Sequence, residues 1–195
     1  GIYALLLTGL TWQRSKVWHD TVTMFSDAID YRNARGYSGP TPTIALPYSN
    51  RGLAKKRAGD LEGAMSDYNA AIQANPGYPT GFLNRGNLYF LQNKPDLAIK
   101  DQNRAIELDP NNYLAYANRG AALASAGQYE PAIADFNKSL SLQPNFLDGL
   151  SNRALTYYTM GNNQAALKDV EQYLRINPND ANMQSFRQEI QAKLQ

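Results

Sequence analysis

The sequence contains no cysteine and a single histidine, His19, among its 195 residues. Without cysteine the chain can form neither a disulfide framework nor a thiolate metal site. One histidine cannot form a histidine-based metal site, and no serine, cysteine or carboxylate constellation accompanies it to support nucleophilic catalysis. We therefore expect His19 to be an ordinary surface or half-buried side chain. We predict no catalytic residue, no bound metal and no cofactor.

Net charge is also small. The formal net charge of +2 indicates no nucleic-acid partner, because nucleic-acid binding usually needs a basic stripe on a clearly basic domain.

Long apolar runs are lacking in the opening segment as well. The apolar stretch from Ile2 to Trp12 has eleven residues, whereas a helix that crosses a bilayer needs about 20. This stretch also lacks the basic start of a signal peptide.

What the sequence does contain is an internal period of 34 residues, seen in four series. The series are Gly52, Gly86, Gly120 and then Ala154; Ala64, Ala98, Ala132 and Ala166; Pro76, Pro110, Pro144 and Pro178; and Asn-Arg-Gly at 50–52, 84–86 and 118–120 with Asn-Arg-Ala at 152–154. Such self-similarity is the signature of a repeat architecture.

Each unit is predicted to contain two helices. The first carries the recurrent glycine, which is costly in a helix and therefore indicates close approach of a partner helix. The second carries the recurrent alanine followed at i+4 and i+7 by residues of one helical face. The i+4 residues are Tyr68, Gln102, Phe136 and Val170. Because Gln102 is the polar member of this series, we expect a looser contact there.

The turns between and after the helices are also periodic. Left-handed caps are expected between the paired helices, at Gly59, Asn93, Gly127 and Gly161. The recurrent prolines are expected to end the second helices.

The recurrent arginine of the Asn-Arg motif stands 16 residues before an equally regular aspartate, as in Arg119 and Asp135. We predict that these residues form an ion pair within or between units, which would fix the register of the helices.

These series resemble those of the tetratricopeptide repeat family. The resemblance extends over residues 45–178, with units at 45–78, 79–112, 113–146 and 147–180, and includes the expected aromatic residue at Tyr48, Phe82 and Tyr116, with Leu150 in the last unit. It implies an all-α fold, a right-handed superhelix (α-solenoid) of helical hairpins. It also implies a concave groove lined by the first helix of each unit, and stability that depends on the stacking of neighbouring units.

Residues 181–195 are predicted to form a C-terminal capping helix. Asp180 is a suitable N-cap residue. Met183, Phe186, Ile190 and Leu194 lie at spacings of three, four and four, and so form one apolar face.

Residues 1–44 do not follow the period, and two interpretations remain open. Residues 18–29 read as the second helix of a degenerate hairpin, followed by a loop over 32–47, with 2–12 as its first helix. Alternatively, 2–12 is the stump of a membrane helix. The stretch from Trp12 to Trp18, with Arg14 and Lys16, resembles the junction in bacterial multipass mannosyltransferase-like membrane proteins with tetratricopeptide tails. On that interpretation the repeats are tethered to a membrane, outside the cytoplasm; a cytoplasmic location is the alternative.

The resemblance also places candidate binding residues in the groove. The family's sixth position holds Asn50, Asn84, Asn118 and Asn152. This column is similar to the asparagine ladder in the groove of the O-GlcNAc transferase repeat domain, where amides can pair with a peptide backbone of any sequence. The alternative is that these asparagines form hydrogen bonds within a helix or to the next unit. Other candidate groove residues are Asn87, Lys56, Arg57, Phe90 and Tyr158.

A pocket near Phe90 and Tyr158 is predicted to hold an anchoring side chain of the ligand. The carboxylate clamp of chaperone-tail receptors is not predicted, because its basic residues are missing and Asp148 stands at one of their positions. We thus expect a non-enzymatic module that binds a protein or peptide in its groove. The alternative is the soluble tail of a membrane glycosyltransferase whose catalytic part lies upstream. The sequence leaves the oligomeric state open, including self-association through the N-terminal segment.

Overall fold

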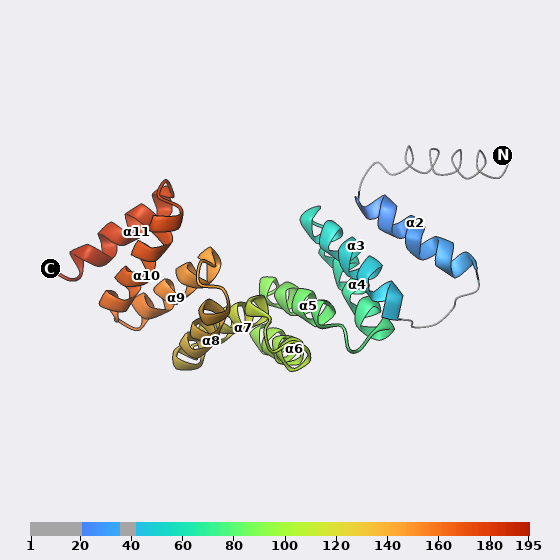
Figure 1. Cartoon of the computed structure of the whole chain (residues 1–195), viewed down its shortest axis with the longest axis horizontal. Coiled ribbons are helices and arrows are strands. Elements are labelled where there is room, and N and C mark those ends of the chain that lie inside the picture. The colour runs from blue at the N-terminus through green and yellow to red at the C-terminus, as the bar shows by residue number, and fades with distance from the viewer. Residues whose placement is uncertain (1–20, 36–41) are drawn as a thin grey trace. The chain divides into compact units, whose positions relative to one another are not determined.

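The computed structural model describes residues 21–35 and 42–195. Within these ranges the protein is all-α, as predicted, with ten α-helices and one short 3-10 helix, arranged as consecutive hairpins along the chain (Figure 1). The helices are α2 (Thr21–Ala34), η1 (Pro42–Ile44), α3 (Ala45–Arg57), α4 (Leu61–Ala74), α5 (Pro79–Leu91), α6 (Pro95–Leu108), α7 (Tyr113–Ser125), α8 (Tyr129–Leu142), α9 (Leu147–Thr159), α10 (Asn163–Ile176) and α11 (Ala181–Ala192).

Two compact units divide the chain between Asn84 and Arg85. In the first unit, α3 packs on α4 and is also contacted by α2. In the second unit, α7 packs on α8 and α9 packs on α10, while α6, α8 and α10 contact the helices that follow them. Each helix therefore contacts mainly its neighbours in sequence, which is the expected property of a repeat protein.

The predicted helix boundaries are confirmed at the tight turns. Gly59, Gly127 and Gly161 have φ angles of +86°, +76° and +79°, and Asn93 has a φ of 57°. These residues adopt the left-handed backbone conformation, which residues with a side chain rarely adopt, and the chain reverses there between the paired helices. The recurrent prolines follow two residues after the ends of α4, α6, α8 and α10. The end of each hairpin is thus encoded locally.

The recurrent glycines allow the paired helices to approach closely. A Cβ atom added to Gly120 would lie 2.8 Å from Cε1 of Phe136, which is fully buried.

The expectation of a looser contact at Gln102 is wrong. Its side chain is also fully buried, and its Nε2 would lie 2.6 Å from a Cβ on Gly86. The long amide side chain occupies the space above Gly86 as the aromatic rings of Tyr68 and Phe136 do above Gly52 and Gly120.

The predicted Arg/Asp pairs form within each hairpin. In every case Nε and Nη2 of the arginine donate to the two carboxylate oxygens of the aspartate 16 residues later, at 2.6–2.9 Å. The pairs are Arg51–Asp67, Arg85–Asp101, Arg119–Asp135 and Arg153–Asp169. The aspartates are buried, so each carboxylate depends on its arginine for neutralisation.

The start of the described chain differs from the predicted boundaries. Instead of ending at Ile29, α2 continues to Ala34, because no glycine or proline interrupts the chain before Gly36. Both ends of the predicted loop over 32–47 are therefore helical. Residues 32–34 belong to α2, η1 spans Pro42–Ile44, and α3 begins at Ala45 with Pro47 in its first turn, where a missing N–H does no harm. Residues 36–41 lie outside the described residues. The predictions for 2–12, 12–18 and His19 lie outside the described residues.

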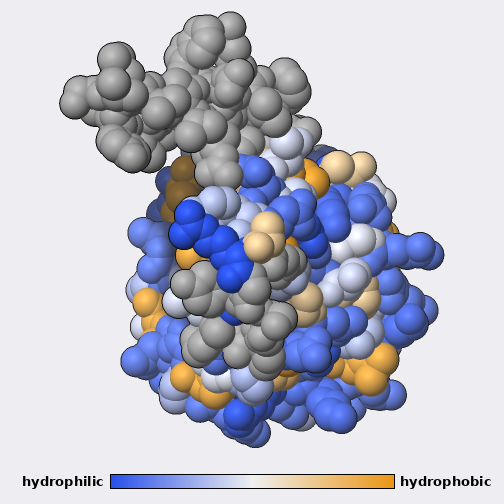
Figure 2. Space-filling view, turned by 90° about the vertical axis from the view of Figure 1, so that its right-hand side faces the viewer, coloured by the Kyte–Doolittle hydropathy of each residue, from blue (hydrophilic) through white to orange (hydrophobic). Residues whose placement is uncertain are grey.

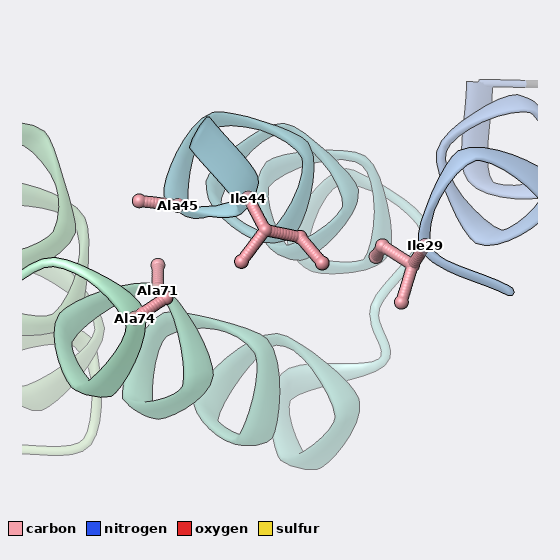
Figure 3. Close-up of a cluster of buried hydrophobic side chains, with 5 residues drawn as sticks. All are labelled: Ile29, Ile44, Ala45, Ala71 and Ala74. Atoms are coloured by element: carbon pink, nitrogen blue, oxygen red, sulfur yellow. The ribbon is translucent and has the colours of Figure 1, made fainter. Parts of the chain in front are cut away.

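A small apolar cluster joins α2 to the first hairpin. Ile29 of α2 is buried with Ile44 and Ala45 at the start of α3 and with Ala71 and Ala74 of α4. Figure 3 shows these side chains converging from the separate elements. The interaction of α2 with the first hairpin therefore rests on a buried apolar contact, and Nη1 of Arg51 adds a hydrogen bond of 3.2 Å to Oγ of Ser26.

At the other end of the chain, α11 covers the last hairpin. Asp180 caps it by accepting a hydrogen bond of 3.0 Å from the backbone N–H of Met183. Ile190 is fully buried against a cluster that includes Ala154, Val170 and Leu174, and Met183 and Phe186 pack on the same cluster. Leu194 does not belong to this face. It lies beyond the end of α11 and is 47% exposed.

The outer surface seen in Figure 2 is mainly hydrophilic, and hydrophobic residues appear on that face in separate patches. Within residues 21–35 and 42–195, no helix combines the length and the hydrophobicity needed to cross a bilayer.

Candidate functional site

The predicted asparagine series lies on the first helix of each hairpin, at Asn50 of α3, Asn84 of α5, Asn118 of α7 and Asn152 of α9. All four are half-buried. Asn84 differs from the others because its Nδ2 donates a hydrogen bond of 3.1 Å to Oγ of Ser49 on α3. Asn84 therefore bonds to a side chain on another helix of the first unit, which is the structural role that the sequence left open.

The side-chain amides of the other candidate asparagines form no such hydrogen bond within the described residues. Among the described residues, none forms a hydrogen bond with the side chain of Asn50, Asn87, Asn118 or Asn152. A half-buried primary amide offers two donors and an acceptor, and leaving these groups unused is unfavourable unless water or a ligand bonds to them. These four side chains are therefore available to a ligand.

In the second unit, a pocket of about 290 Å³ lies beside Asn152. Its walls include Ala121, Ala124 and Ser125 of α7 and Leu155 and Thr159 of α9, and Phe90 of α5 contributes an aromatic ring. Phe90 is 37% exposed and Leu155 is 56% exposed. The pocket is thus open at its apolar rim, and the small residues of α7 leave space for a side chain.

Tyr158 lies elsewhere. Its ring packs edge-on against Phe186 of α11, with ring centroids 5.2 Å apart, and its hydroxyl donates a hydrogen bond to Glu189. Lys193 lies 4.2 Å above the same ring. Tyr158 is thus engaged by the C-terminal helix, and it does not line the pocket beside Phe90.

The first unit contains a second pocket, of about 590 Å³, between α2 and α3. Val22 and Phe25 of α2 face Leu53, Ala54 and Ala58 there, and Asn50 and Arg57 supply the polar atoms. Lys56 lies beside Arg57 at the end of α3. Partial burial, and then the positive charge of Arg57, lower the pKa of Lys56.

The structure also reveals linking residues that sequence reasoning missed. Nη1 of Arg119 donates to Oδ1 of Asn103 on the preceding hairpin at 2.7 Å, and Nη1 of Arg153 donates to Asn137 at the same distance. A signal was present, since asparagine recurs at 69, 103 and 137 with the 34-residue period. It was less visible than the glycine and proline series because asparagine has no strong conformational signature inside a helix.

The side chains described above are suited to non-covalent binding of a ligand. Within the described ranges, no group of three or more histidine or acidic side chains is positioned to hold a metal ion. The groups available for binding are the asparagine amides without a hydrogen-bond partner among the described residues, the two apolar pockets, and the cations Lys56 and Arg57 of α3. Amides pair with peptide groups, apolar pockets accept side chains and cations pair with carboxylates.

Comparisons with known proteins agree with this description. Models described as tetratricopeptide repeat match residues 79–112, 113–146 and 147–180, and one described as TPR repeat matches residues 52–93. No relative matches among curated proteins.

Several solved structures are similar. A tetratricopeptide repeat protein from Parabacteroides merdae is 19% identical, with a TM-score of 0.73 over 98% of this chain and 73% of that chain. The first TPR of Spaghetti (RPAP3), solved with the HSP90 peptide SRMEEVD, is 26% identical, with a TM-score of 0.60 over 64% of this chain and 98% of that chain. The first TPR domain of human RPAP3 is 27% identical, with a TM-score of 0.60 over 62% and 95% of the two chains.

Proposed function

Because this chain belongs to the tetratricopeptide repeat family, whose domains bind protein or peptide partners, we propose that it binds an extended peptide segment of a partner protein on the first helices of its hairpins. The ligand backbone bonds to uncommitted asparagine amides, and one of its apolar side chains enters the pocket beside Phe90. The chain itself performs no chemistry. The similar Spaghetti (RPAP3) domain, with its bound HSP90 peptide, supports a short peptide as the class of ligand.

The observation that carries this proposal is the position of Asn152 on the wall of an open apolar pocket. Asn118 lies three residues before Ala121 on α7, so the two share one helical face. An amide column beside an apolar pocket provides both backbone pairing and an anchor for one side chain, which is the usual combination in peptide recognition.

The roles of the individual asparagines differ in this proposal. Asn118 and Asn152 contact the ligand, because their side chains have no partner among the described residues. Asn84 stabilises the first unit through Ser49. The proposal therefore assigns peptide binding to only part of the asparagine column.

The test is selection from a random dodecapeptide display library on the full chain, followed by fluorescence polarisation with the enriched peptides. The double variant Asn118→Ala with Asn152→Ala should bind these peptides about thirtyfold more weakly, because two hydrogen bonds of about 1 kcal/mol each are lost. Ala124→Leu, which fills the pocket, should select against peptides with a large apolar residue.

The matched control is Asn145→Ala with Asn179→Ala, which removes two exposed loop amides. It should leave the affinity unchanged. Full affinity in the Asn118/Asn152 variant would remove the asparagines from the binding site, and the absence of any enriched peptide would overturn the proposal as a whole.

A second candidate function is the soluble tail of a membrane glycosyltransferase with its catalytic part upstream. It is favoured by the apolar residues at 2–12 and by Trp12, Arg14 and Lys16, which follow in the order expected at a membrane interface. The gene's reading frame tests it. Several apolar runs of about 20 residues upstream of Gly1 would support this function, and a start codon directly before Gly1 would overturn it.

A further inference from the structure

The pocket between α2 and α3 combines apolar walls with charges of one sign. Val22, Phe25, Leu53 and Ala54 form most of its lining. Arg57 reaches its edge from the last turn of α3, and Lys56 is the neighbouring residue. Both helices belong to the first unit, so all of the described lining residues lie within that unit.

The cations of α3 fall into two pairs with different environments. Arg51 and Lys55 both bond to the buried carboxylate of Asp67, at 2.6 and 3.0 Å. In the part of the chain that the structure describes, neither Lys56 nor Arg57 has an acidic partner. Asp67 therefore pairs with Arg51 and Lys55, and in the described part of the chain no carboxylate pairs with Lys56 or Arg57.

Lys56 is held in an unfavourable environment, whereas Arg57 is exposed. Partial burial lowers the pKa of Lys56, and the adjacent charge of Arg57 lowers it further. The negative end of the α3 dipole offsets part of this cost. A carboxylate placed between the two cations would offset the rest, because an opposite charge favours the protonated lysine.

We propose that the α2–α3 pocket binds an acidic segment of a partner protein, with a large apolar side chain against Phe25 and Leu53 and a neighbouring carboxylate at Lys56 and Arg57. This inference rests on the proposed function and adds the chemical class of the partner. The geometry favours a peptide over an anionic lipid surface, since a concave pocket with apolar walls accepts one side chain, whereas a membrane surface binds flat or convex basic faces.

The test uses an array of immobilised heptapeptides and the full chain. Each peptide carries one leucine, phenylalanine or alanine, flanked by two glutamates, two glutamines or two lysines in an otherwise glycine–serine sequence. The unmodified chain should bind the glutamate peptides at least about fivefold more tightly than the glutamine peptides, and the lysine peptides least, because the charges are complementary.

Two variants locate the site. Lys56→Gln with Arg57→Gln should abolish the preference for glutamate over glutamine. Ala54→Leu, which fills the pocket, should abolish the preference for leucine or phenylalanine and retain the preference for glutamate. The matched control is Lys100→Gln with Lys168→Gln, which removes two exposed lysines from α6 and α10 and leaves both preferences unchanged. Circular dichroism verifies that each variant is folded.

Three results would overturn the inference. The first is an unchanged glutamate preference in the Lys56/Arg57 variant. The second is binding to vesicles of phosphatidylserine and phosphatidylcholine that depends on Lys56 and Arg57 while the peptides do not bind. The third is a concentration-dependent mass that Ala54→Leu abolishes, which would identify a second copy of the chain as the occupant. The proposed function survives the first result if the peptides selected from the dodecapeptide library still require Asn118 and Asn152.

Discussion

Arg119 of α7 donates a hydrogen bond of 2.7 Å to Asn103 of α6, and so joins two successive hairpins. The same guanidinium donates two hydrogen bonds to Asp135 within its own hairpin. A planar guanidinium can make both connections at once because its donors point in fixed, divergent directions. Arg153 repeats the arrangement with Asp169 and Asn137. In these two hairpins one arginine thus fixes the pairing of helices inside the hairpin and joins it to the preceding hairpin.

Removing this arginine should destabilise the second unit. Arg119→Ala leaves the buried carboxylate of Asp135 without its partner, and we expect a loss of about 2–4 kcal/mol in the free energy of unfolding. Urea denaturation followed by circular dichroism measures it. Arg104→Ala is the control, since the Arg104–Glu107 pair is largely exposed and should contribute less than about 0.5 kcal/mol. Equal urea midpoints for the two variants would contradict this account.

The recurrent glycine and the residue opposite it should be energetically coupled. Gly120→Ala places a methyl group against the buried ring of Phe136, and we expect it to cost about 1–3 kcal/mol. In the last hairpin the equivalent positions hold Ala154 and Val170, which are buried in the same cluster. The double variant Gly120→Ala with Phe136→Val should therefore be more stable than the sum of the single effects, by about 1–2 kcal/mol. A double-mutant cycle by urea denaturation tests this, and strict additivity would contradict it.

The hydroxyl of Tyr68 should reduce stability. It is buried, and it has no hydrogen-bond partner in the part of the chain that the structure describes. Tyr68→Phe removes this unsatisfied group and should raise the free energy of unfolding by about 1 kcal/mol at neutral pH. Tyr78→Phe, at a less buried tyrosine, is the control. A destabilised Tyr68→Phe would indicate that the hydroxyl has a partner after all.

The same residue should make stability depend on alkaline pH. Burial, and then the charge of Asp67, raise the pKa of Tyr68 from 10.0 to about 12. As the pH rises from about 10 to about 12, the unfolded chain loses this proton while the folded chain keeps it, so folding becomes less favourable. The unmodified chain should lose more stability between pH 9 and about 11 than Tyr68→Phe does. Equal losses, measured by urea denaturation at both pH values, would contradict the assignment.

The C-terminal helix should stabilise the last hairpin through one residue. Ile190 is fully buried against the apolar cluster of α9 and α10. Ile190→Ala should cost about 2–4 kcal/mol, because it removes buried methyl groups and leaves a cavity. Leu194→Ala, at an exposed position beyond α11, should be nearly neutral. Hydrogen exchange of the α10 amides should increase in the first variant only, and unchanged exchange would show that α11 does not support the hairpin.

Much of the fold can be predicted from residues that repeat. The Gly/Pro series predicts where helices begin and end, because a left-handed φ or a missing N–H acts within a few residues of its position. The Arg/Asp pairs were predictable from their constant 16-residue spacing. The prediction for Gln102 failed because polarity suggested a loose contact, whereas the empty space above Gly86 determines how closely its side chain packs.

The candidate binding residues were less predictable. Asn84, Asn118 and Asn152 occupy the same position of the repeat, yet Asn84 bonds to Ser49 and the other two have no partner among the described residues. Tyr158 was predicted beside Phe90, but Phe186, Glu189 and Lys193 of α11 engage it. In each case the difference comes from a residue on another helix that does not follow the period.

By itself, the sequence determined the hairpins, their turns, their internal ion pairs and the family, since each depends on residues at short or constant separation. Only the tertiary structure decided which side chains of the repeated positions remain available. Asn152 lies on the wall of an open pocket, whereas Asn84 bonds to Ser49. Arg51 and Lys55 pair with Asp67, whereas Lys56 and Arg57 have no acidic partner in the described part of the chain. The physical reason is that a helix is specified by its own residues, whereas the availability of a side chain depends on what the neighbouring helices place beside it.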